Sequence, residues 1–222
     1  MADGGRLPEA ALLESLDAVY RLDREGSATL ARLAKRLHLE EDDAKSRVRD
    51  LEARGLVRAE GPDRLVPTAE GERVALGLVR RHRLLERFLT DTLGLPWHRV
   101  HEEASRLTPV LADDIAEALA KHLGAPATCP HGHPIPSADG TLSHEEGTPL
   151  HRLRAGQGGT ILRIDREEPE LLKYLAALGL LPETRIEVEE VGPFGGPILV
   201  RSAGSRYALG RKIAARILVR PA

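Results

Sequence analysis

The sequence is poor in cysteine and in aromatic residues, and it has no long apolar run. Its single cysteine, Cys129, excludes an intrachain disulfide. No run is long enough for a membrane span or a signal peptide, which favours a cytoplasmic protein. Aromatic residues make up 3 % of the chain and hydrophobic residues 41 %, so its cores must be aliphatic. We therefore expect helices that pack through aliphatic stripes.

An excess of positive charge is also absent. Lys and Arg number 32 against 34 Asp and Glu, which gives a formal net charge of −2. A protein with this charge has no basic coat for nucleic acid, so any DNA contact must come from a local patch. The sequence also lacks a phosphate-binding loop, a nucleophile elbow and paired catalytic carboxylates, which argues against an enzyme.

The clearest element is one long helix, expected from Thr68 to Leu93 because the Thr68 hydroxyl can cap it and its leucines share one face. His82 and Glu86 lie four residues apart on this helix, and His101 follows on the next expected helix. An imidazole and a carboxylate one turn apart can share a divalent cation. The alternative is an ordinary intrahelical polar pair.

Three short amphipathic segments precede the long helix, and a hairpin lies between them and it. The first expected helix follows a loose arm that ends at Pro8 and runs to Arg24, the second opens at Ser27 or Thr29 and carries Leu37, and the third covers about 41–54. The expected strands cover 56–59 and 64–67. This order predicts a winged helix-turn-helix DNA-binding domain over residues 1–75.

In such a domain the start of the third helix enters the major groove. Here that start is the acidic run 40–43, whose carboxylates would oppose the DNA phosphates. A solvated cap on a structural helix is therefore the alternative. We predict a DNA-binding surface made of Asp42, Asp43, Lys45, Ser46, Arg47 and Arg49.

Two more apolar helices are expected, one ending at Leu107 and one over residues 111–123. With the long helix they form an expected helical dimerisation and metal-binding domain over residues 76–123. A homodimer would match palindromic DNA, since both have two-fold symmetry. Intramolecular packing of these faces is the alternative.

Residues 124–149 are dense in Pro, Gly, Ser and His and have no apolar period, which predicts a linker with little regular structure. Cys129, His131 and His133 lie in it. Structural zinc sites use four ligands at finger-like spacing, and a fourth ligand is missing here, so we expect no metal at these residues.

The last part of the chain, residues 150–222, changes character to short strands separated by Gly and Pro. Strands are expected at 158–164, 185–191, 197–201 and 215–219, with a helix over 169–178. A small β-barrel with one or two helical turns fits this pattern.

Four stretches give the chain a family resemblance. They read ARLAKRLHLEEDDAKSRVRDLEARGLV, RRHRLLERFLTDTLGLPWHRVHEEASRL, CPHGHPIP, and LLKYLAALGLLPETRIEV with GGPILV. Over nearly its whole length the chain resembles the diphtheria toxin repressor family of iron- and manganese-responsive bacterial repressors. Its tail resembles the SH3-like domain of ferrous-iron transport proteins. The implied fold is multidomain α+β, with a mainly α N-terminal half followed by a small SH3-like barrel.

The resemblance implies two metal sites. The first takes His82, Glu86 and His101 together with groups from the SH3-like domain. Glu168 is the candidate for the acidic group, and Glu170 is the substitute for the family's amide position, which falls on Leu171. The family positions of the second, usually activating site fall on Glu14, Ser105, Thr108 and Pro109. Hydroxyls are poor ligands and proline offers none, so we expect this second site to be lost.

The resemblance therefore implies a dimeric, metal-dependent transcriptional regulator of metal homeostasis that binds palindromic double-stranded DNA. Mn²⁺ or Fe²⁺ is the favoured cofactor, with Zn²⁺ as an option in vitro. The alternative is a diverged member that acts as a metal-binding or protein-interaction module with weak or no operator binding. An enzyme is a third reading, which needs a metal with an open position in a deep pocket.

Overall fold

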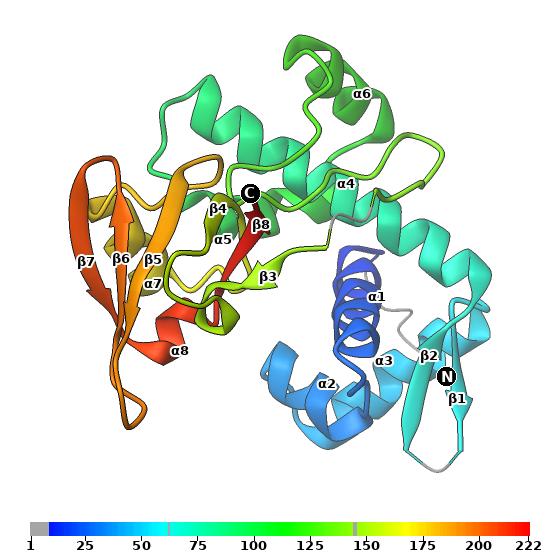
Figure 1. Ribbon diagram of the computed structural model, residues 1–222. Coiled ribbons are helices and arrows are strands. Elements are labelled where there is room, and N and C mark those ends of the chain that lie inside the picture. The colour runs from blue at the N-terminus through cyan, green and yellow to red at the C-terminus, as the bar shows by residue number, and fades with distance from the viewer. Residues whose placement is uncertain (1–8, 62, 144–145) are drawn as a thin grey trace, which may run out of the picture. The chain divides into compact units, whose positions relative to one another are not determined.

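The computed structural model describes residues 9–61, 63–143 and 146–222 (Figure 1). The chain divides into two compact units. The first contains residues 1–82, 105–118 and 136–141, and the second contains residues 83–104, 119–135 and 142–222. In the described part of the chain, no helix is both long and apolar enough to cross a membrane.

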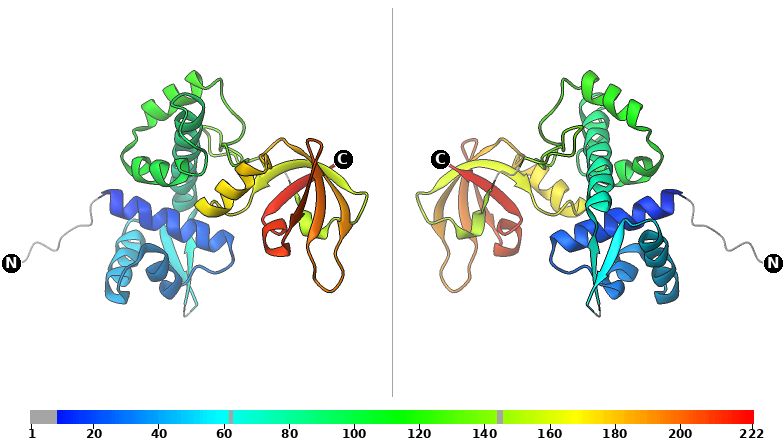
Figure 2. Two further views of the ribbon diagram at one scale, coloured as in Figure 1. Left: turned by 90° about the vertical axis from the view of Figure 1, so that its left-hand side faces the viewer. Right: turned by 90° about the vertical axis from the view of Figure 1, so that its right-hand side faces the viewer.

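The first unit begins with three helices and a hairpin, which lie together in Figures 1 and 2. They are α1 (Glu9–Arg24), α2 (Leu30–Leu37), α3 (Glu41–Ala53), β1 (Val57–Glu60) and β2 (Arg64–Pro67). The strands pair antiparallel, and Pro62 of the expected turn lies outside the described residues. Thr29 caps α2 by accepting a hydrogen bond from the Arg32 amide at 3.3 Å, as expected of a capping hydroxyl.

The core of this part is aliphatic, as the composition predicts. Leu12 and Leu16 of α1, Leu33 of α2 and Leu51 of α3 are fully buried in one cluster. These leucines recur at helical spacing, so each helix is amphipathic and turns one face to the others. The mainly helical N-terminal half is thereby confirmed.

Helix α4 (Ala69–Asp91) is the long helix that the sequence predicts. Its first turn is capped because the Gly71 amide donates to the Thr68 hydroxyl at 3.0 Å. A Cβ at Gly71 would lie 1.8 Å from the Leu56 carbonyl oxygen, so only glycine allows α4 to start this close to the hairpin. The helix runs through the boundary between the two units, which falls after His82.

Three shorter helices follow α4. They are α5 (Val100–Leu107), the 3₁₀ turn η1 (Thr108–Val110) and α6 (Asp113–His122). Pro109 lies in η1 and ends the α-helical run there, as predicted.

The second unit contains a six-stranded antiparallel sheet in the order β3-β8-β4-β5-β6-β7. Its strands are β3 (Thr148–Pro149), β4 (Gly158–Ile164), β5 (Arg185–Val191), β6 (Ile198–Ser202), β7 (Ser205–Leu209) and β8 (Ile217–Pro221). Short helices accompany them: η2 (Leu150–Arg152), α7 (Pro169–Ala177) and α8 (Arg211–Ala214). The hairpin of β5 and β6, orange in Figure 2, extends beyond the rest of this sheet.

This sheet encloses the second core, in which Ile161, Val188, Val200 and Val219 are fully buried. Alternate residues of β5 and β6 are buried in this core, which is the period-two pattern of a half-buried sheet. The small β-barrel is confirmed. The sequence did not predict β3, β7 or α8, because two to five residues carry too short a pattern.

The expected linker has little regular structure over its described residues, but it is tightly packed. Arg83 and Arg87 of α4 donate to the carbonyls of Pro134 and Thr128. The Ile164 amide donates to the His131 carbonyl at 3.0 Å. Gly132 has a φ of +88°, and a Cβ there would lie 2.0 Å from the Leu162 carbonyl oxygen. Residues 124–135 of this segment are therefore packed against the rest of the second unit, while residues 136–141 belong to the first unit.

Candidate metal centre

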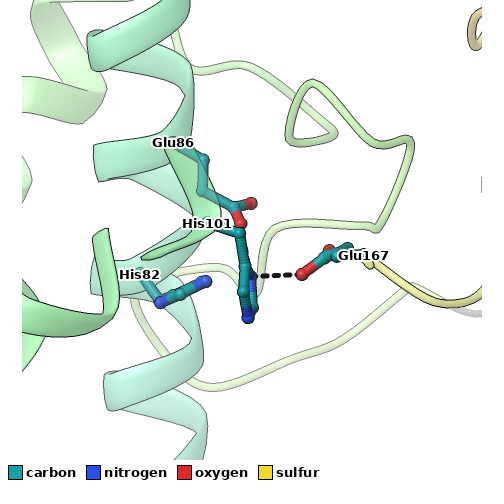
Figure 3. Close-up of side chains that lie close together, drawn as sticks. All are labelled: His82, Glu86, His101 and Glu167. Atoms are coloured by element: carbon teal, nitrogen blue, oxygen red, sulfur yellow. Dashed lines mark hydrogen bonds and ion pairs between the residues drawn. The ribbon is translucent and has the colours of Figure 1, made fainter. Parts of the chain in front are cut away.

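Three elements of the second unit bring two carboxylates and an imidazole together. Glu86 comes from α4, His101 from α5 and Glu167 from the loop before α7. The His101 Nδ1 atom lies 3.0 Å from Glu86 Oε1 and also pairs with Glu167 Oε2. Figure 3 shows these side chains turned toward one another. Glu86 is fully buried, which is rare for a carboxylate without positively charged or metal partners.

His82 lies one turn before Glu86 on α4, so the helix itself sets its place beside that carboxylate (Figure 3). The His82 side chain is buried, and the Thr108 hydroxyl lies 3.4 Å from its Nδ1 atom. The ligand atoms of His82, Glu86, His101 and Glu167 all lie within 4.8 Å of one another.

The packed linker segment contributes Cys129 and His131 to the same place. The Cys129 amide donates to the His133 carbonyl at 2.8 Å, which closes a tight loop around Gly132. The His131 Nε2 atom donates to the Trp97 carbonyl at 2.8 Å. Its Nδ1 atom faces the carboxylates, 3.5 Å from Glu86 Oε1 and 3.4 Å from Glu167 Oε1. A histidine held this way presents Nδ1 as a ligand.

This loop completes a second set of ligand atoms, which all lie within 4.8 Å of one another. The set contains Glu86, Cys129, His131 and Glu167. It shares both carboxylates with the set that contains His82 and His101. All four residues belong to the second unit.

Protons on the histidines balance the negative charges of the carboxylates in this cluster. Burial favours neutral His101, but the hydrogen bonds that it donates to the carboxylates of Glu167 and Glu86 outweigh burial and raise its pKa to about 9. The pKa of His131 is also raised, because Cys129, Glu167 and Glu86 outweigh burial. Burial opposes ionisation of Glu167, yet His101 and His131 hold its pKa well below the usual range. The carboxylates of Glu86 and Glu167 thus favour the protonated form of both imidazoles.

Two neighbours of the cluster stay uncharged. Burial, with the negative charge of Glu86 next, raises the pKa of the Cys129 thiol to about 12. Burial lowers the pKa of His133 to about 4, and its Nε2 atom lies 3.0 Å from the Ile164 carbonyl oxygen.

This donor set fits a divalent transition metal. Imidazole nitrogens and carboxylate oxygens suit Mn²⁺ and Fe²⁺, and the thiol adds a donor that Zn²⁺ accepts readily. An ion of charge +2 can replace the protons of His101 and His131 without a change in net charge. The cluster can therefore exchange protons for metal.

The acidic residue beside His101 is Glu167, and this corrects the register expected for the SH3-like groups. The Glu168 side chain is 65 % exposed and faces Arg166 at 3.9 Å, and Glu170 lies exposed in the first turn of α7. Neither belongs to a ligand group among the described residues. Sequence reasoning also missed Cys129 and His131, because their partners come from distant segments. The octapeptide CPHGHPIP was the signal that could have found them.

Of the family positions of the second site implied by the resemblance, only Glu14 carries a carboxylate. The Glu14 carboxylate pairs with Arg47 of α3 at 3.0 Å. The Arg47 guanidinium also donates to the Ala11 carbonyl at 3.1 Å and the Ser15 hydroxyl at 3.2 Å. The Arg47 side chain is only 15 % exposed, so it is a structural tie between α1 and α3 and not a free DNA contact. Of the other family positions, Thr108 contacts His82 and Pro109 lies in η1.

The expected DNA-binding surface keeps its remaining members on α3. Lys45 pairs with Glu41 at 2.7 Å and with Asp42 at 3.5 Å, so two of the acidic residues already hold its charge. Lys45, Arg49 and Asp42 line a cleft of about 450 Å³ between α3 and the hairpin. Asp43 is exposed and Ser46 half-buried.

Comparison with known families gives two matches. Residues 68–137 match the family described as "Iron dependent repressor, metal binding and dimerisation domain". Residues 148–221 match the FeoA domain.

Whole-chain relatives are repressors. The iron-dependent repressor IdeR of Mycobacterium leprae (strain TN) is 31 % identical over 217 residues, which cover 92 % of this chain and 94 % of IdeR. The diphtheria toxin repressor of Corynebacterium diphtheriae is 38 % identical over 125 residues, 56 % of this chain and 55 % of that protein. Among solved structures, a manganese-dependent transcriptional repressor in complex with manganese matches with a TM-score of 0.84 at 33 % identity, over 94 % of this chain and 98 % of that chain. ScaR with bound Cd²⁺ matches with a TM-score of 0.77 at 25 % identity, over 96 % and 99 %.

Proposed function

The chain belongs to the iron-dependent repressor family, which includes the diphtheria toxin repressor, and from this membership we propose that it is a metal-dependent transcriptional regulator of metal homeostasis. The observation that carries the proposal is the cluster of buried carboxylates, imidazoles and a thiol in a chain that also has a winged helix-turn-helix. Members of this family are repressors, so the protein is not an enzyme. We place its action in the cytoplasm.

Glu86 and Glu167 would hold a divalent transition ion, together with His82 and His101 in one group of ligand atoms and with Cys129 and His131 in the other. When bound, it supplies a positive charge that ties carboxylates and imidazoles from separate segments. Glu86 lies on α4, so a metal ion bound to it would also be linked to this helix. The first half of α4 belongs to the unit that contains the winged domain. Binding that favours one conformation of this helix and its neighbours would shift the population competent for DNA.

The DNA-binding surface in this proposal is α3 with the hairpin. Arg49 and Lys45 supply the charges for phosphate contact, and Ser46 is the candidate for base contact. Arg47 is withdrawn from this role because Glu14 and the α1 backbone hold it.

We propose a homodimer that binds palindromic DNA. In the first unit, Leu107, Val110 and Ile115 are 43 %, 73 % and 48 % exposed on successive elements α5, η1 and α6. Exposed apolar side chains of this size mark an interaction surface. The family match of this region is to a dimerisation domain, which supports a second copy as the partner.

One observation favours a second candidate function. The exposed carboxylates at the start of α3 oppose phosphate, and Lys45 already pairs with two of them. A member that kept the metal centre and lost operator binding would act as a metal-binding or protein-interaction module.

Selection of bound sequences from a random double-stranded DNA pool tests the proposal. The pool is incubated with the full-length protein either with Mn²⁺ or Fe²⁺ or with a chelator. We expect enrichment of a palindrome only with metal, and binding that weakens steeply with salt. No enrichment under any metal at low salt would favour the interaction module.

A further inference from the structure

The charge of this chain is unevenly divided along the sequence. Residues 1–75, which include the winged domain, contain 13 Lys and Arg against 16 Asp and Glu, a formal net charge of −3. Residues 150–222, which form the SH3-like domain, contain 12 Lys and Arg against 8 Asp and Glu, a formal net charge of +4. Contacts with phosphate supply a large share of the affinity of a protein for DNA. The domain with the recognition helix is therefore the poorer of the two in the charge that DNA requires.

The positive charge of the SH3-like domain is concentrated in two segments. Residues 150–157 and 210–216, which contain η2 and α8, include no Asp or Glu, and α8 packs against η2. Their five basic residues, here called the basic patch, are Arg152, Arg154, Arg211, Lys212 and Arg216. Arg152, Arg154 and Lys212 are exposed, and no ion pair within the described residues joins these three to a carboxylate. Three cationic groups of the patch are thus open to an anionic partner.

The nearby carboxylates belong to strand β5, which accepts a hydrogen bond from the Gly156 amide at the Val188 carbonyl. Glu189 is 12 % exposed and pairs with Arg201 and Arg206, so its charge is already balanced. Glu187 and Glu190 are exposed. The patch itself therefore remains a region of positive charge beside a strand of mixed charge.

The tip of the β5–β6 hairpin adjoins this patch. The Arg211 Nε atom donates to the Gly196 carbonyl at 3.1 Å, and Figures 1 and 2 show α8 and the tip at the same end of the sheet. The Gly192 amide donates to the Pro197 carbonyl at 2.8 Å, so the tip is also closed by its own backbone. Phe194 lies at this tip, with a fully exposed side chain and a φ of 54°.

This conformation of Phe194 is unfavourable in two ways. A positive φ is rare for a bulky side chain and costs free energy, and an aromatic ring in water loses the stabilisation of burial. Strain of this kind is typical of functional positions. Proteins that bind nucleic acid place basic groups against phosphates and aromatic or other apolar side chains against sugars and bases. The basic patch and Phe194 supply both kinds of contact on neighbouring elements.

We propose that the basic patch and Phe194 form a second surface for double-stranded DNA, separate from the surface on α3. The basic groups contact phosphates, and the Phe194 ring contacts the groove beside them. Duplex DNA is the favoured partner because the chain carries a winged helix-turn-helix whose own charge is negative. This inference rests on the proposed function and adds a source of phosphate affinity that offsets the acidic start of α3.

The salt dependence of DNA binding tests the proposal. Full-length protein in saturating Mn²⁺ is titrated onto a labelled duplex, either of selected or of unrelated sequence, and fluorescence anisotropy is measured at several salt concentrations. The slope of log affinity against log salt changes by about 0.9 for each phosphate contact. We expect the triple variant Arg152→Gln, Arg154→Gln, Lys212→Gln to have a slope shallower by about 2.7 on both duplexes. Its affinity at low salt should fall at least about tenfold.

The matched control is the triple variant Arg166→Gln, Lys173→Gln, Arg185→Gln. It removes the same charge from exposed positions of the same domain outside η2 and α8, so it should keep the wild-type slope. Phe194→Ala should lower the affinity about fivefold or more without a change in slope, because the ring carries no charge. Circular dichroism of each variant verifies folding.

Equal slopes for the patch variant and the wild type would overturn the second surface and leave the proposed function intact. An equal loss of slope in both triple variants would also overturn it, because overall charge and not the patch would then be responsible. Sedimentation with phosphatidylglycerol vesicles examines another anionic partner, and patch-dependent vesicle binding with an unchanged DNA slope would overturn the assignment to DNA. A wild type that binds neither duplex at low salt would contradict the DNA-binding function as well.

Discussion

The metal centre around Glu86 and the pair of Glu14 with Arg47 both place carboxylates beside positive charge, but the charge comes from different sources. At the metal centre it comes from protons on His101 and His131, whose pKa values are raised by the carboxylates. At Glu14 it comes from a guanidinium, which stays protonated at any physiological pH. A metal ion can displace the protons of the histidines, but it cannot displace an arginine side chain.

The family resemblance implies a metal ion at both places. At Glu14, an arginine side chain supplies the positive charge instead of a metal ion. The Arg47 guanidinium donates hydrogen bonds to Glu14, the Ala11 carbonyl and the Ser15 hydroxyl. A positive charge on α3 is thereby bound to α1.

Glu167→Gln should have the largest effect, because this carboxylate belongs to both ligand sets. Loss of partners outside the ligand shell costs roughly 10- to 100-fold in metal affinity, so loss of a shared ligand should cost at least about 100-fold. Isothermal titration calorimetry measures this. Glu168→Gln is the matched control, since the neighbouring side chain is exposed. Equal affinity in the Glu167 variant and the wild type would contradict the assignment.

Acid should weaken metal binding. Below its pKa of about 9, His101 is protonated in the metal-free protein, and the metal must displace that proton. Apparent affinity should therefore fall about tenfold per pH unit for each displaced proton. Calorimetry at pH 8, 7 and 6 in buffers of different ionisation enthalpy measures the apparent affinity and the number of protons displaced per metal ion. Affinity that is independent of pH would mean that His101 is not a ligand.

The same pKa shift predicts the opposite pH trend for the stability of the metal-free protein. The pKa of His101 is raised from 6.5 to about 9 on folding. Its contribution is fully present below pH 6.5 and is lost as the pH rises through 9. Urea unfolding of the chelator-treated protein across this range measures it.

Arg47→Met should lower stability in the first unit and leave metal affinity unchanged. It removes hydrogen bonds to Glu14, Ser15 and the Ala11 carbonyl, each worth about 0.5–1.5 kcal/mol, and Glu14 can rehydrate. We expect a loss of about 1–2 kcal/mol in the free energy of unfolding. If Arg47 were a DNA contact instead, urea melts would be unchanged and only DNA affinity would fall.

The double variant Asp42→Asn, Asp43→Asn should show the smallest effect on stability and a gain in DNA affinity. Asparagine keeps the local hydrogen-bonding ability and removes two charges that oppose phosphate, and it also frees Lys45 from Asp42. Stability should change by no more than about 1 kcal/mol. An electrophoretic titration measures the DNA affinity of the wild type and of the double variant. Weaker binding by the variant would mean that these aspartates contact bases.

The sequence predicted most of the fold because its elements are local. Helix α4 and strands β4 and β5 follow from apolar periods and caps, and their observed bounds match the expected ones within a few residues. The pairing of His82 with Glu86 follows from helical spacing alone. These features need no knowledge of tertiary packing.

The rest of the metal centre could not be predicted this way. Cys129 and His131 find their partners in segments about 40 residues away in either direction along the chain, so a rule that asks for four ligands close in sequence rejects them. Residues 167 and 168 are both glutamates, and only the backbone before α7 decides which one faces His101. The tie between Arg47 and Glu14 likewise depends on how α1 and α3 pack.

The central claim is that metal at the buried centre controls DNA binding, and one titration tests it most directly. Fluorescence anisotropy of the selected DNA is measured with the wild type and with His101→Ala, each in saturating Mn²⁺ and in chelator. Coupling between two sites is typically worth about 1–3 kcal/mol, or about 5- to 150-fold. The account predicts that metal tightens wild-type binding by a factor in this range and does not change binding by the variant. Equal wild-type affinity with and without metal would contradict it.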